Sequence, residues 1–470
     1  MSGRVKIVLA CPKPREPFTP YGPPIGLCYI ASVLKKNGYR DVSGVDLNVN
    51  SFDEYQKLVK NADVVGIYCS TKTFLESIKM AKNAKKINPN ITVVLGGPHP
   101  SLCPEEVISQ ESVDVCCVNE GEYAMLELVQ AINNKTDFSD VKGIWFKNNG
   151  KVEFTGYREI IKNLDELPFP DRTIFDLDKY KSTAITICAS RGCPFRCTNC
   201  QPALTKFTGP FRFRSVHNVI EEIKQIRSNW EVLHFVDNVL TVNRNWITTF
   251  CKELINKNLK VKWDCQSHVN TTDEELLQLM KDAGCMNVGI GIESGSQRVL
   301  DLIRKGITLQ KAADVVKIAK KVNIPLHAWF MIGIPGETRG DIENTIEFAK
   351  SLDVDSIGFS IGTPWPSTGF YHDCKTNGWL LTSYWGEFNE KKYSRIKTPD
   401  FCPEDIAYYR EKILSDFKKM GWIINEDDFM VYRPRSFLKR SVEILLQHAG
   451  VLDAVIKLRR KLTRKLLAST

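Results

Sequence analysis

Three cysteines stand close together in the stretch "RGCPFRCTNC" (191–200), at the spacing C-x3-C-x2-C: Cys193, Cys197 and Cys200. Thiolates bind soft metals, but a structural zinc site normally takes four protein ligands, and no C-x2-C or H-x3-H pair lies nearby. A closed four-iron cluster in an electron carrier also takes four thiolates. Three thiolates on a four-iron cluster leave one iron without a protein ligand, and that iron can bind a substrate or a cofactor. The alternatives are a chance clustering of cysteines and a zinc site with a remote fourth ligand.

The composition indicates where such a cluster would operate. The chain has 470 residues, 43% hydrophobic and 25% charged, which is typical of a globular protein of about three domains. The other twelve of its fifteen cysteines are scattered, apart from the adjacent Cys116 and Cys117. The N-terminal stretch has too short an apolar run for a secretory signal peptide, and no run of about 18 apolar residues marks a membrane span. We therefore expect a reducing, cytoplasmic compartment, where clustered cysteines bind metal or react rather than form disulfides.

The first part of the chain alternates short apolar runs with stretches of helical spacing. Strands are expected at 4–10, 42–47, 62–70, 91–97 and 113–119. Such alternation predicts an α/β, doubly wound parallel sheet with helices on both faces. Ligands of these sheets bind beyond the carboxyl ends of the strands, where residues 69–74 and 96–100 would lie.

A second series of strands follows a connector rich in Pro and Asp. These strands are expected at 184–190, 232–238, 261–267, 286–293, 325–333 and 356–362. Six strand–helix units predict a partial parallel barrel, a (β/α)6 arrangement with its chemistry at the carboxyl ends of the strands. The cysteines directly follow the first of these strands. The expected domains are a Rossmann-like domain at 1–140, a linker at 141–180, the partial barrel at 181–380 and a helical, basic C-terminal region at 381–470.

Residues 184–365 resemble the radical S-adenosylmethionine (radical SAM) enzymes, whose signature is C-x3-C-x2-C with an aromatic residue at the position of Phe195. The resemblance implies that the three cysteines hold a 4Fe–4S cluster and that SAM chelates its open iron. It also implies which residues contact SAM: Asp237 and Asn238 at the methionine end, Glu293 at the ribose, and Gly333 and Gly336 near adenine. At His268 relatives often carry arginine, so no SAM contact is expected there.

The N-terminal part is similar to the cobalamin-binding module that precedes the barrel in one large radical SAM subgroup. The similar stretches are 23–39, 62–73, 93–100 and 119–122, together with "LPFPDR" (167–172). The resemblance implies that cobalamin is held near Ser70, Thr71, Thr73, Gly96, Gly97 and His99. The D-x-H-x-x-G motif that supplies a histidine to cobalt in other corrinoid enzymes is absent, and His99 is the only histidine before the linker. We therefore expect cobalamin without a histidine ligand, and His99 as a packing residue.

Most of the positive charge lies at the end of the chain. From Arg433 onward, ten Lys or Arg stand against Glu443 and Asp453, a net +8 of the total +9. Leucine and other apolar residues recur there at helical spacing, and a basic amphipathic helix suits an anionic membrane surface. A solvated helix packed on the barrel is an equal alternative. No base-reading module accompanies the charge, so no nucleic acid partner is expected.

The resemblance implies an oxygen-sensitive, cobalamin-dependent enzyme that cleaves SAM to a 5′-deoxyadenosyl radical. The radical would functionalise an unactivated carbon of a small, lipophilic substrate, by methylation or by cyclisation or another C–C bond formation. An external donor of the flavodoxin or ferredoxin type would supply electrons. The alternatives are a cobalamin-free relative, a methylthiotransferase and a non-catalytic iron–sulfur electron-transfer protein. A methylthiotransferase needs a second cysteine triad, which the spread Cys11, Cys28 and Cys69 do not resemble.

Overall fold

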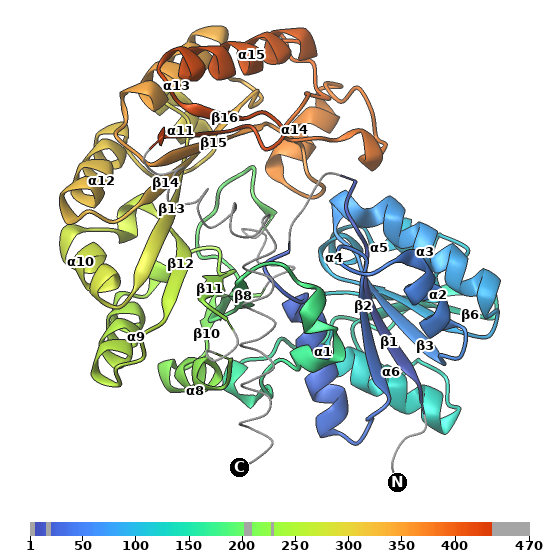
Figure 1. Ribbon diagram of the computed structural model, residues 1–470. Coiled ribbons are helices and arrows are strands. Elements are labelled where there is room, and N and C mark those ends of the chain that lie inside the picture. Colours follow the sequence, from blue (N-terminus) through green and yellow to red (C-terminus); the bar gives the residue numbers. More distant parts are fainter. Residues whose placement is uncertain (1–4, 16–19, 202–208, 227–229, 435–470) are drawn as a thin grey trace. The chain divides into compact units, whose positions relative to one another are not determined.

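The computed structural model describes residues 5–15, 20–201, 209–226 and 230–434 (Figure 1). These residues form two compact units. We call residues 5–186 with 209–214 the N-terminal unit, and residues 187–201 with 215–434 the barrel unit. Within this part of the chain, no helix combines the length and apolar character that crossing a membrane requires.

The N-terminal unit is built on a seven-stranded sheet in the order β2-β1-β3-β4-β5-β6-β7. Its strands are β1 (Ile7–Cys11), β2 (Val42–Asp46), β3 (Val64–Tyr68), β4 (Thr92–Gly96), β5 (Val115–Cys117), β6 (Ile144–Asn148) and β7 (Lys151–Phe154). The first five are parallel, and every residue of β1 is buried, as expected for a sheet covered on both faces. β2 lies on one side of β1, whereas β3, β4 and β5 follow on the other side. The strand order therefore reverses between β1 and β3, and sheets of this kind bind ligands at such a point.

Helices cover both faces of this sheet. They are α1 (Ile25–Lys36), α2 (Phe52–Val59), α3 (Phe74–Ile87), α4 (Pro98–Leu102), α5 (Pro104–Ile108) and α6 (Glu122–Asn134), with 3₁₀ turns η1 (Thr71–Thr73), η2 (Leu164–Glu166), η3 (Arg172–Ile174) and η4 (Leu177–Lys179). Helix α1 packs beside α6, whereas α2 packs beside α3. The expected doubly wound fold is thereby confirmed.

Strands β6 and β7 come from residues that the sequence analysis assigned to the linker. They form an antiparallel hairpin whose two-residue loop is Asn149–Gly150, and both loop residues have positive φ, 49° and 80°. An Asn-Gly loop is the strongest short-range signal for such a hairpin. Trp145 and Phe154 stack across it, with ring centroids 4.8 Å apart. The hairpin thus extends the N-terminal sheet, because β6 pairs with β5.

The barrel unit contains an eight-stranded sheet in the order β16-β17-β15-β14-β13-β12-β11-β8. The strands of this sheet are β8 (Ala184–Ile187), β11 (Val232–Phe235), β12 (Lys262–Ser267), β13 (Cys285–Glu293), β14 (Leu326–Ile332), β15 (Ser356–Ile361), β16 (Ile423–Asn425) and β17 (Met430–Tyr432). Residues 184–186 of β8 fall within the range of the N-terminal unit. Two short strands, β9 (Ser190–Arg191) and β10 (Arg212–Phe213), form a separate two-stranded sheet. The strands from β11 to β15 pair in parallel in chain order. The six expected barrel strands, β8 and β11–β15, are therefore confirmed. Strands β16 and β17 were not expected, and they add an antiparallel edge next to β15.

Helices cover the outer side of the partial barrel, and several of them follow the convex face of the curved sheet in Figure 1. They are α8 (Val216–Ile226), α9 (Arg244–Asn256), α10 (Glu274–Asp282), α11 (Gln297–Leu302), α12 (Leu309–Val322), α13 (Arg339–Ser351), α14 (Gly369–Thr376) and α15 (Pro403–Lys419), with 3₁₀ turns η6 (Leu240–Val242), η7 (Val269–Thr271) and η8 (Trp385–Glu387). Phe235, Phe250 and Trp263 are completely buried where the sheet meets α9, with ring centroids 5.5–5.8 Å apart. Burial of such side chains contributes roughly 1.5–3 kcal/mol each. Most of the basic tail, residues 435–470, lies outside the described residues.

Candidate functional site

The cysteine loop follows β8 at the carboxyl end of the barrel strands. Gly192, with φ 87°, turns the chain into the loop. Cys193 is buried, whereas Cys197 and Cys200 are partly exposed, and the N–H of Cys200 donates to the carbonyl of Cys197 at 3.3 Å. All fifteen cysteines lie in the described part of the chain, and none of them is paired in a disulfide there. The three thiols are therefore available as metal ligands.

Asp237 and Asn238, after β11, hold the segment that leads into this loop. Asp237 is 2% exposed, and its carboxylate accepts from the N–H of Ala189 at 3.0 Å and from the hydroxyl of Ser190. Burial raises the pKa of Asp237 to about 6, although these hydrogen bonds lower it. Asn238 is exposed and donates to the carbonyl of Gly192 at 3.1 Å. Both side chains thus fix the backbone just ahead of Cys193.

Phe195, inside the cysteine loop, stacks on His268 with ring centroids 3.9 Å apart and planes inclined by 15°. His268 is buried, and its Nδ1 accepts from the N–H of Asn270 at 3.2 Å. Burial, followed by the charge of Lys305, lowers the pKa of His268 to about 4. His268 is therefore a neutral aromatic platform for Phe195 at physiological pH.

Glu293 ends β13 in a left-handed conformation, φ 72°, after a register shift between Gly291 and Glu293. Its Oε1 accepts from Nζ of Lys305 at 2.8 Å, and the side chain of Lys305 is only 10% exposed. A Cβ added at Gly291 would lie 2.5 Å from that oxygen and 2.8 Å from that nitrogen. Glycine at 291 therefore leaves the space that the ion pair fills.

The three thiols and this ion pair lie within electrostatic reach of one another. Burial raises the pKa values of Cys193 and Cys197, and the charge of Lys305 lowers both. Burial favours the neutral amine of Lys305, but the negative charges of Glu293, Cys197 and Cys200 raise its pKa above the ordinary value. The ammonium of Lys305 is thus paired with Glu293 and interacts electrostatically with all three cysteines.

The segment "MIGIPGET" (331–338) follows β14 and turns twice in the left-handed region, at Gly333 and Gly336, both with φ 80°. Glu337 is completely buried, and its Oε2 accepts from the N–H groups of Gly333 at 2.6 Å and Ile334 at 3.0 Å. Burial raises the pKa of Glu337 to about 8, although the two N–H donors lower it. A buried carboxyl group therefore holds this turn from inside.

Helix α11 and the turn behind it connect these separate loops. The carbonyl of Ile303 accepts from the N–H of Thr198 at 3.0 Å, inside the cysteine loop. The carbonyl of Gly306 accepts from the side chain of Asn270 at 2.7 Å, and Arg298 donates to the carbonyl of Gly336 at 2.7 Å. Together with Lys305 and Glu293, these contacts tie the loops after β8, β12, β13 and β14 to one short segment.

The concave face of the barrel carries polar and aromatic side chains that sequence reasoning did not single out. His234 of β11 pairs with Asp264 of β12, and Nδ1 of His327 lies 2.7 Å from the hydroxyl of Ser356. His327 also meets Trp329 edge-on at 4.2 Å. Successive side chains of a strand point to opposite faces. The alternation of these polar and aromatic residues with buried apolar residues along each strand was therefore the sequence signal that could have placed them on the inner face.

The second candidate region lies in the N-terminal unit, after β3 and β4. Ser70 caps η1, because its N–H and hydroxyl both lie 3.0 Å from the hydroxyl of Thr73. Gly96 and Gly97 are partly exposed, and Gly97 has φ 114°. A Cβ at Gly97 would lie 2.8 Å from the carbonyl oxygen of Cys69, so only glycine fits this approach of two loops. The expected residues 70–73 and 96–97 therefore lie together at the carboxyl edge of the sheet.

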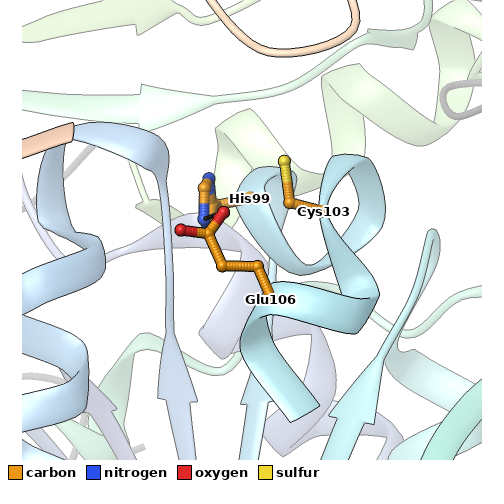
Figure 2. Close-up of side chains that lie close together, drawn as sticks. All are labelled: His99, Cys103 and Glu106. Atoms are coloured by element: carbon orange, nitrogen blue, oxygen red, sulfur yellow. Dashed lines mark ion pairs between the residues drawn. The ribbon is translucent and has the colours of Figure 1, made fainter. Parts of the chain in front are cut away.

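His99 lies behind these loops, completely buried, between Thr71 and Glu106. Its Nδ1 is 3.1 Å from the hydroxyl of Thr71, and its Nε2 is 3.6 Å from the carboxylate of Glu106. Figure 2 shows this carboxylate against the imidazole, with Cys103, the residue between α4 and α5, beside them. The ligand atoms of His99, Cys103 and Glu106 lie within 4.8 Å of one another, a spacing that could admit a metal ion. Both ring nitrogens of His99 thus face groups of the protein.

Comparison with protein families identifies both regions. The family model of the radical SAM superfamily matches residues 187–349, and that of the B12 binding domain matches residues 16–129. An uncharacterized methyltransferase of Pyrococcus horikoshii is 35% identical over 441 residues, 91% of this chain and 94% of the relative. The chain belongs to the cobalamin-dependent radical SAM family.

Other similarities agree with this assignment. The anaerobic magnesium-protoporphyrin IX monomethyl ester cyclase of Rubrivivax gelatinosus is 30% identical over 84% of this chain and 73% of the relative. The radical SAM methyltransferase TsrM from Kitasatospora setae, solved with tryptophan and the SAM analogue aza-SAM, has the same fold. Its TM-score is 0.72 at 15% identity, over 98% of this chain and 99% of that chain.

The family establishes the general activity and cofactors of this chain. It is a radical SAM enzyme of a family that contains methyltransferases and cyclases. A radical SAM domain implies a 4Fe–4S cluster and SAM, and the B12 binding domain implies cobalamin. Lys305 and Glu337 are site residues that sequence reasoning missed, because a lysine or a glutamate in a loop is ordinarily solvated.

Glu337 leads to a testable prediction about pH. Its folded pKa, about 8, lies above the ordinary value of 4.5, so folding favours the protonated carboxyl group and disfavours the ionised one. The stability that this group contributes should be complete below about pH 4.5 and be lost as pH rises through 8, by up to about 1.4 kcal/mol per pH unit. Urea unfolding of wild type and Glu337→Gln at pH 5, 6.5 and 8 measures this, since glutamine cannot ionise. A difference in free energy of unfolding that is constant with pH would contradict the prediction.

Proposed function

We propose that Cys193, Cys197 and Cys200 ligate the 4Fe–4S cluster and that its fourth iron is left for SAM. The observation that carries this proposal is that the three cysteines share one loop at the carboxyl end of the first barrel strand, and that all three interact electrostatically with one buried ammonium, Lys305. Thiolates suit an iron–sulfur cluster, and the loop that bears them is anchored through Thr198. When bound there, the cluster supplies the electron that cleaves SAM.

We propose that SAM lies along the carboxyl edge of the same strands. Phe195, held by its stacking partner His268, forms an aromatic wall. Asn238 and Asp237 define the methionine end: Asn238 is exposed there, and Asp237 holds the backbone behind it. Glu293 takes the ribose hydroxyls. Backbone groups of the turn at Gly333 and Gly336 bind adenine, because left-handed glycines allow close approach.

We propose that cobalamin is held at the carboxyl edge of the N-terminal sheet by Ser70, Thr71, Thr73, Gly96 and Gly97. Both glycines are partly exposed, and a Cβ added at Gly96 would have only the Cβ of Cys117 near it, at 3.7 Å. This open backbone suits the close approach of a large ring. His99 supports the site from behind through Thr71. Because His99 is completely buried between two protein partners, cobalt is bound without a histidine ligand.

We propose that the substrate is lipophilic and that one of its unactivated carbons is functionalised by methylation, cyclisation or C–C bond formation. The support is the 30% identity to a magnesium-protoporphyrin IX monomethyl ester cyclase and the apolar, basic pattern of residues 433–470. Anaerobic reaction with SAM, substrate extract and reduced flavodoxin or ferredoxin distinguishes the outcomes. S-adenosylhomocysteine together with 5′-deoxyadenosine indicates methylation, whereas 5′-deoxyadenosine alone indicates cyclisation or coupling. Failure of either protein donor to support SAM cleavage would exclude that class of electron donor.

We also propose a cytoplasmic, oxygen-free setting and a division at residues 1–140, 141–180, 181–380 and 381–470. The hairpin β6–β7 belongs structurally to the first part, since it extends the N-terminal sheet. Limited proteolysis of the holoenzyme should cut within 155–180 before it cuts within either family-matched region. Exposure to air should bleach the cluster, and an air-stable cluster would contradict the oxygen-free setting.

The first functional prediction concerns the cluster ligands. Anaerobically reconstituted wild type should contain about four irons per chain, and Cys193→Ala, Cys197→Ala or Cys200→Ala should each abolish SAM cleavage and lose most of that iron. Iron and sulfide analysis with a 5′-deoxyadenosine assay measures both effects. Cys402→Ala is the matched control, because Cys402 is also partly exposed but lies at the start of α15. Full SAM cleavage by Cys197→Ala would overturn the assignment.

The second concerns cobalamin. Protein supplied with hydroxocobalamin should retain a corrin spectrum after desalting, and the spectrum should show no histidine nitrogen on cobalt. His99→Gln should leave that spectrum unchanged, whereas loss of a buried hydrogen bond should lower the free energy of unfolding by about 1–3 kcal/mol. Nitrogen hyperfine coupling from a histidine in the EPR spectrum of the cob(II)alamin form, lost in His99→Gln, would contradict the proposal.

The third concerns the tail, whose residues 435–470 lie outside the described part of the chain. We propose peripheral contact with an anionic membrane surface. Each buried methylene contributes roughly 0.8 kcal/mol and each Lys or Arg about 1 kcal/mol, so full-length protein should co-sediment with anionic liposomes at low salt and less at high salt. Removing 451–470 should reduce binding and leave SAM cleavage intact. Folded full-length protein that ignores anionic liposomes at low salt would exclude membrane contact, and a truncated protein that unfolds would identify the tail as a packed element.

A further inference from the structure

Lys305 is the most deeply buried amine that the described site contains, and its backbone leaves it little freedom. The residue is 9% exposed, and its N–H donates to the carbonyl of Leu300 at 2.9 Å, at the end of α11. Arg304 and Gly306 on either side are left-handed, with φ 55° and 70°. This tight turn directs the lysine side chain into the site.

The surroundings of the Lys305 Nζ provide a hydrogen-bond acceptor and enough space for the amine. The amine donates to Oε1 of Glu293 at 2.8 Å, and glycine at 291 leaves room for both groups. The carbonyl of Ile303, two residues earlier, accepts from the cysteine loop at Thr198. A displacement of this turn would therefore move the loop and the ion pair together.

The charge balance around Lys305 becomes negative once a cluster is bound. The three cysteines then bind as thiolates beside the carboxylate of Glu293, each cysteine interacts electrostatically with the ammonium of Lys305, and His268 nearby is neutral. Reduction of a cluster bound to these thiolates adds one more negative charge. In a site that water enters little, a fixed positive charge stabilises the reduced form, because Coulomb interactions are stronger at low effective dielectric constant.

We propose that Lys305 is a positioning residue that raises the reduction potential of the cluster and orients Glu293. The proposal rests on the assignment of the cluster to Cys193, Cys197 and Cys200 made above. The cluster potential depends on net charge and hydrogen bonding around the sulfurs, and Lys305 supplies the positive charge. Glu293 opposes it, so the two residues should shift the potential in opposite directions.

The experiment is an EPR-monitored redox titration of anaerobically reconstituted protein in the absence of SAM. At the midpoint potential of wild type, Lys305→Met should have a ratio of reduced to oxidised cluster at least tenfold lower than wild type. This corresponds to a downward shift of the midpoint potential by about 59 mV for one electron. Lys305→Arg keeps the charge and should restore a potential near that of wild type. Glu293→Gln removes the opposing charge and should move the potential upward.

The matched control is Lys320→Met, in which an ion-paired lysine is removed from the outer helix α12 of the same unit. Lys320 lies 3.2 Å from Asp353, and its side chain is 65% exposed. This variant should leave the potential unchanged. A general loss of packing would not shift the potential in opposite directions in Lys305→Met and Glu293→Gln.

The outcomes are distinguishable. If wild type does not assemble a cluster on the three cysteines, the proposed function itself fails. If wild type and Lys305→Met both load about four irons and have the same midpoint, the inference about Lys305 is wrong. If Lys305→Met does not load iron, Glu293→Gln decides, because an unchanged potential in that variant would overturn the inference.

Discussion

The barrel site depends on one buried ion pair, Lys305 with Glu293, and on the short turn that presents the lysine. Burial of two charges costs several kcal/mol per ion unless each finds compensating partners. Here the amine is paired with an acid and interacts electrostatically with the cysteines, and the same turn hydrogen-bonds the cysteine loop through Ile303. Under the proposed assignment of the cluster to these cysteines, the buried positive charge would lie beside the group that takes up an electron.

Around this pair, the loops at the carboxyl ends of the strands are held by buried side chains. Asp237 holds the entry to the cysteine loop, His268 carries Phe195, and Glu337 holds the left-handed turn after β14. Each of these side chains is buried, and burial changes its pKa. Buried supporting side chains of this kind fix the positions of the residues that contact the cofactors. In a cofactor enzyme the cofactors carry out the chemistry, and the protein orients them.

In the N-terminal unit, too, buried groups hold the loops at the carboxyl ends of the strands, but fewer of them are charged. Parallel strands end at one edge, and the loops after β3 and β4 meet there because Gly97 has no side chain. His99 then braces Thr71 from within the sheet edge rather than from its surface. Under the proposed assignment, cobalamin would meet backbone groups at this open edge rather than charged side chains.

The amino-acid sequence was enough to specify the fold class, the six barrel strands, the five parallel strands of the N-terminal sheet and the cysteine loop. Apolar periodicity and the spacing of three cysteines are local signals, so they can be read without knowing what packs against them. The hairpin at 144–154 was missed although its Asn-Gly loop is equally local, because the surrounding Pro and Asp suggested a linker. The folded chain was needed to establish that Lys305 is buried against Glu293, that His268 carries Phe195 and that both nitrogens of His99 face protein groups. The physical reason is that burial and partner choice belong to pairs of loops far apart in the chain, and they exist only once the strands have brought those loops to one edge.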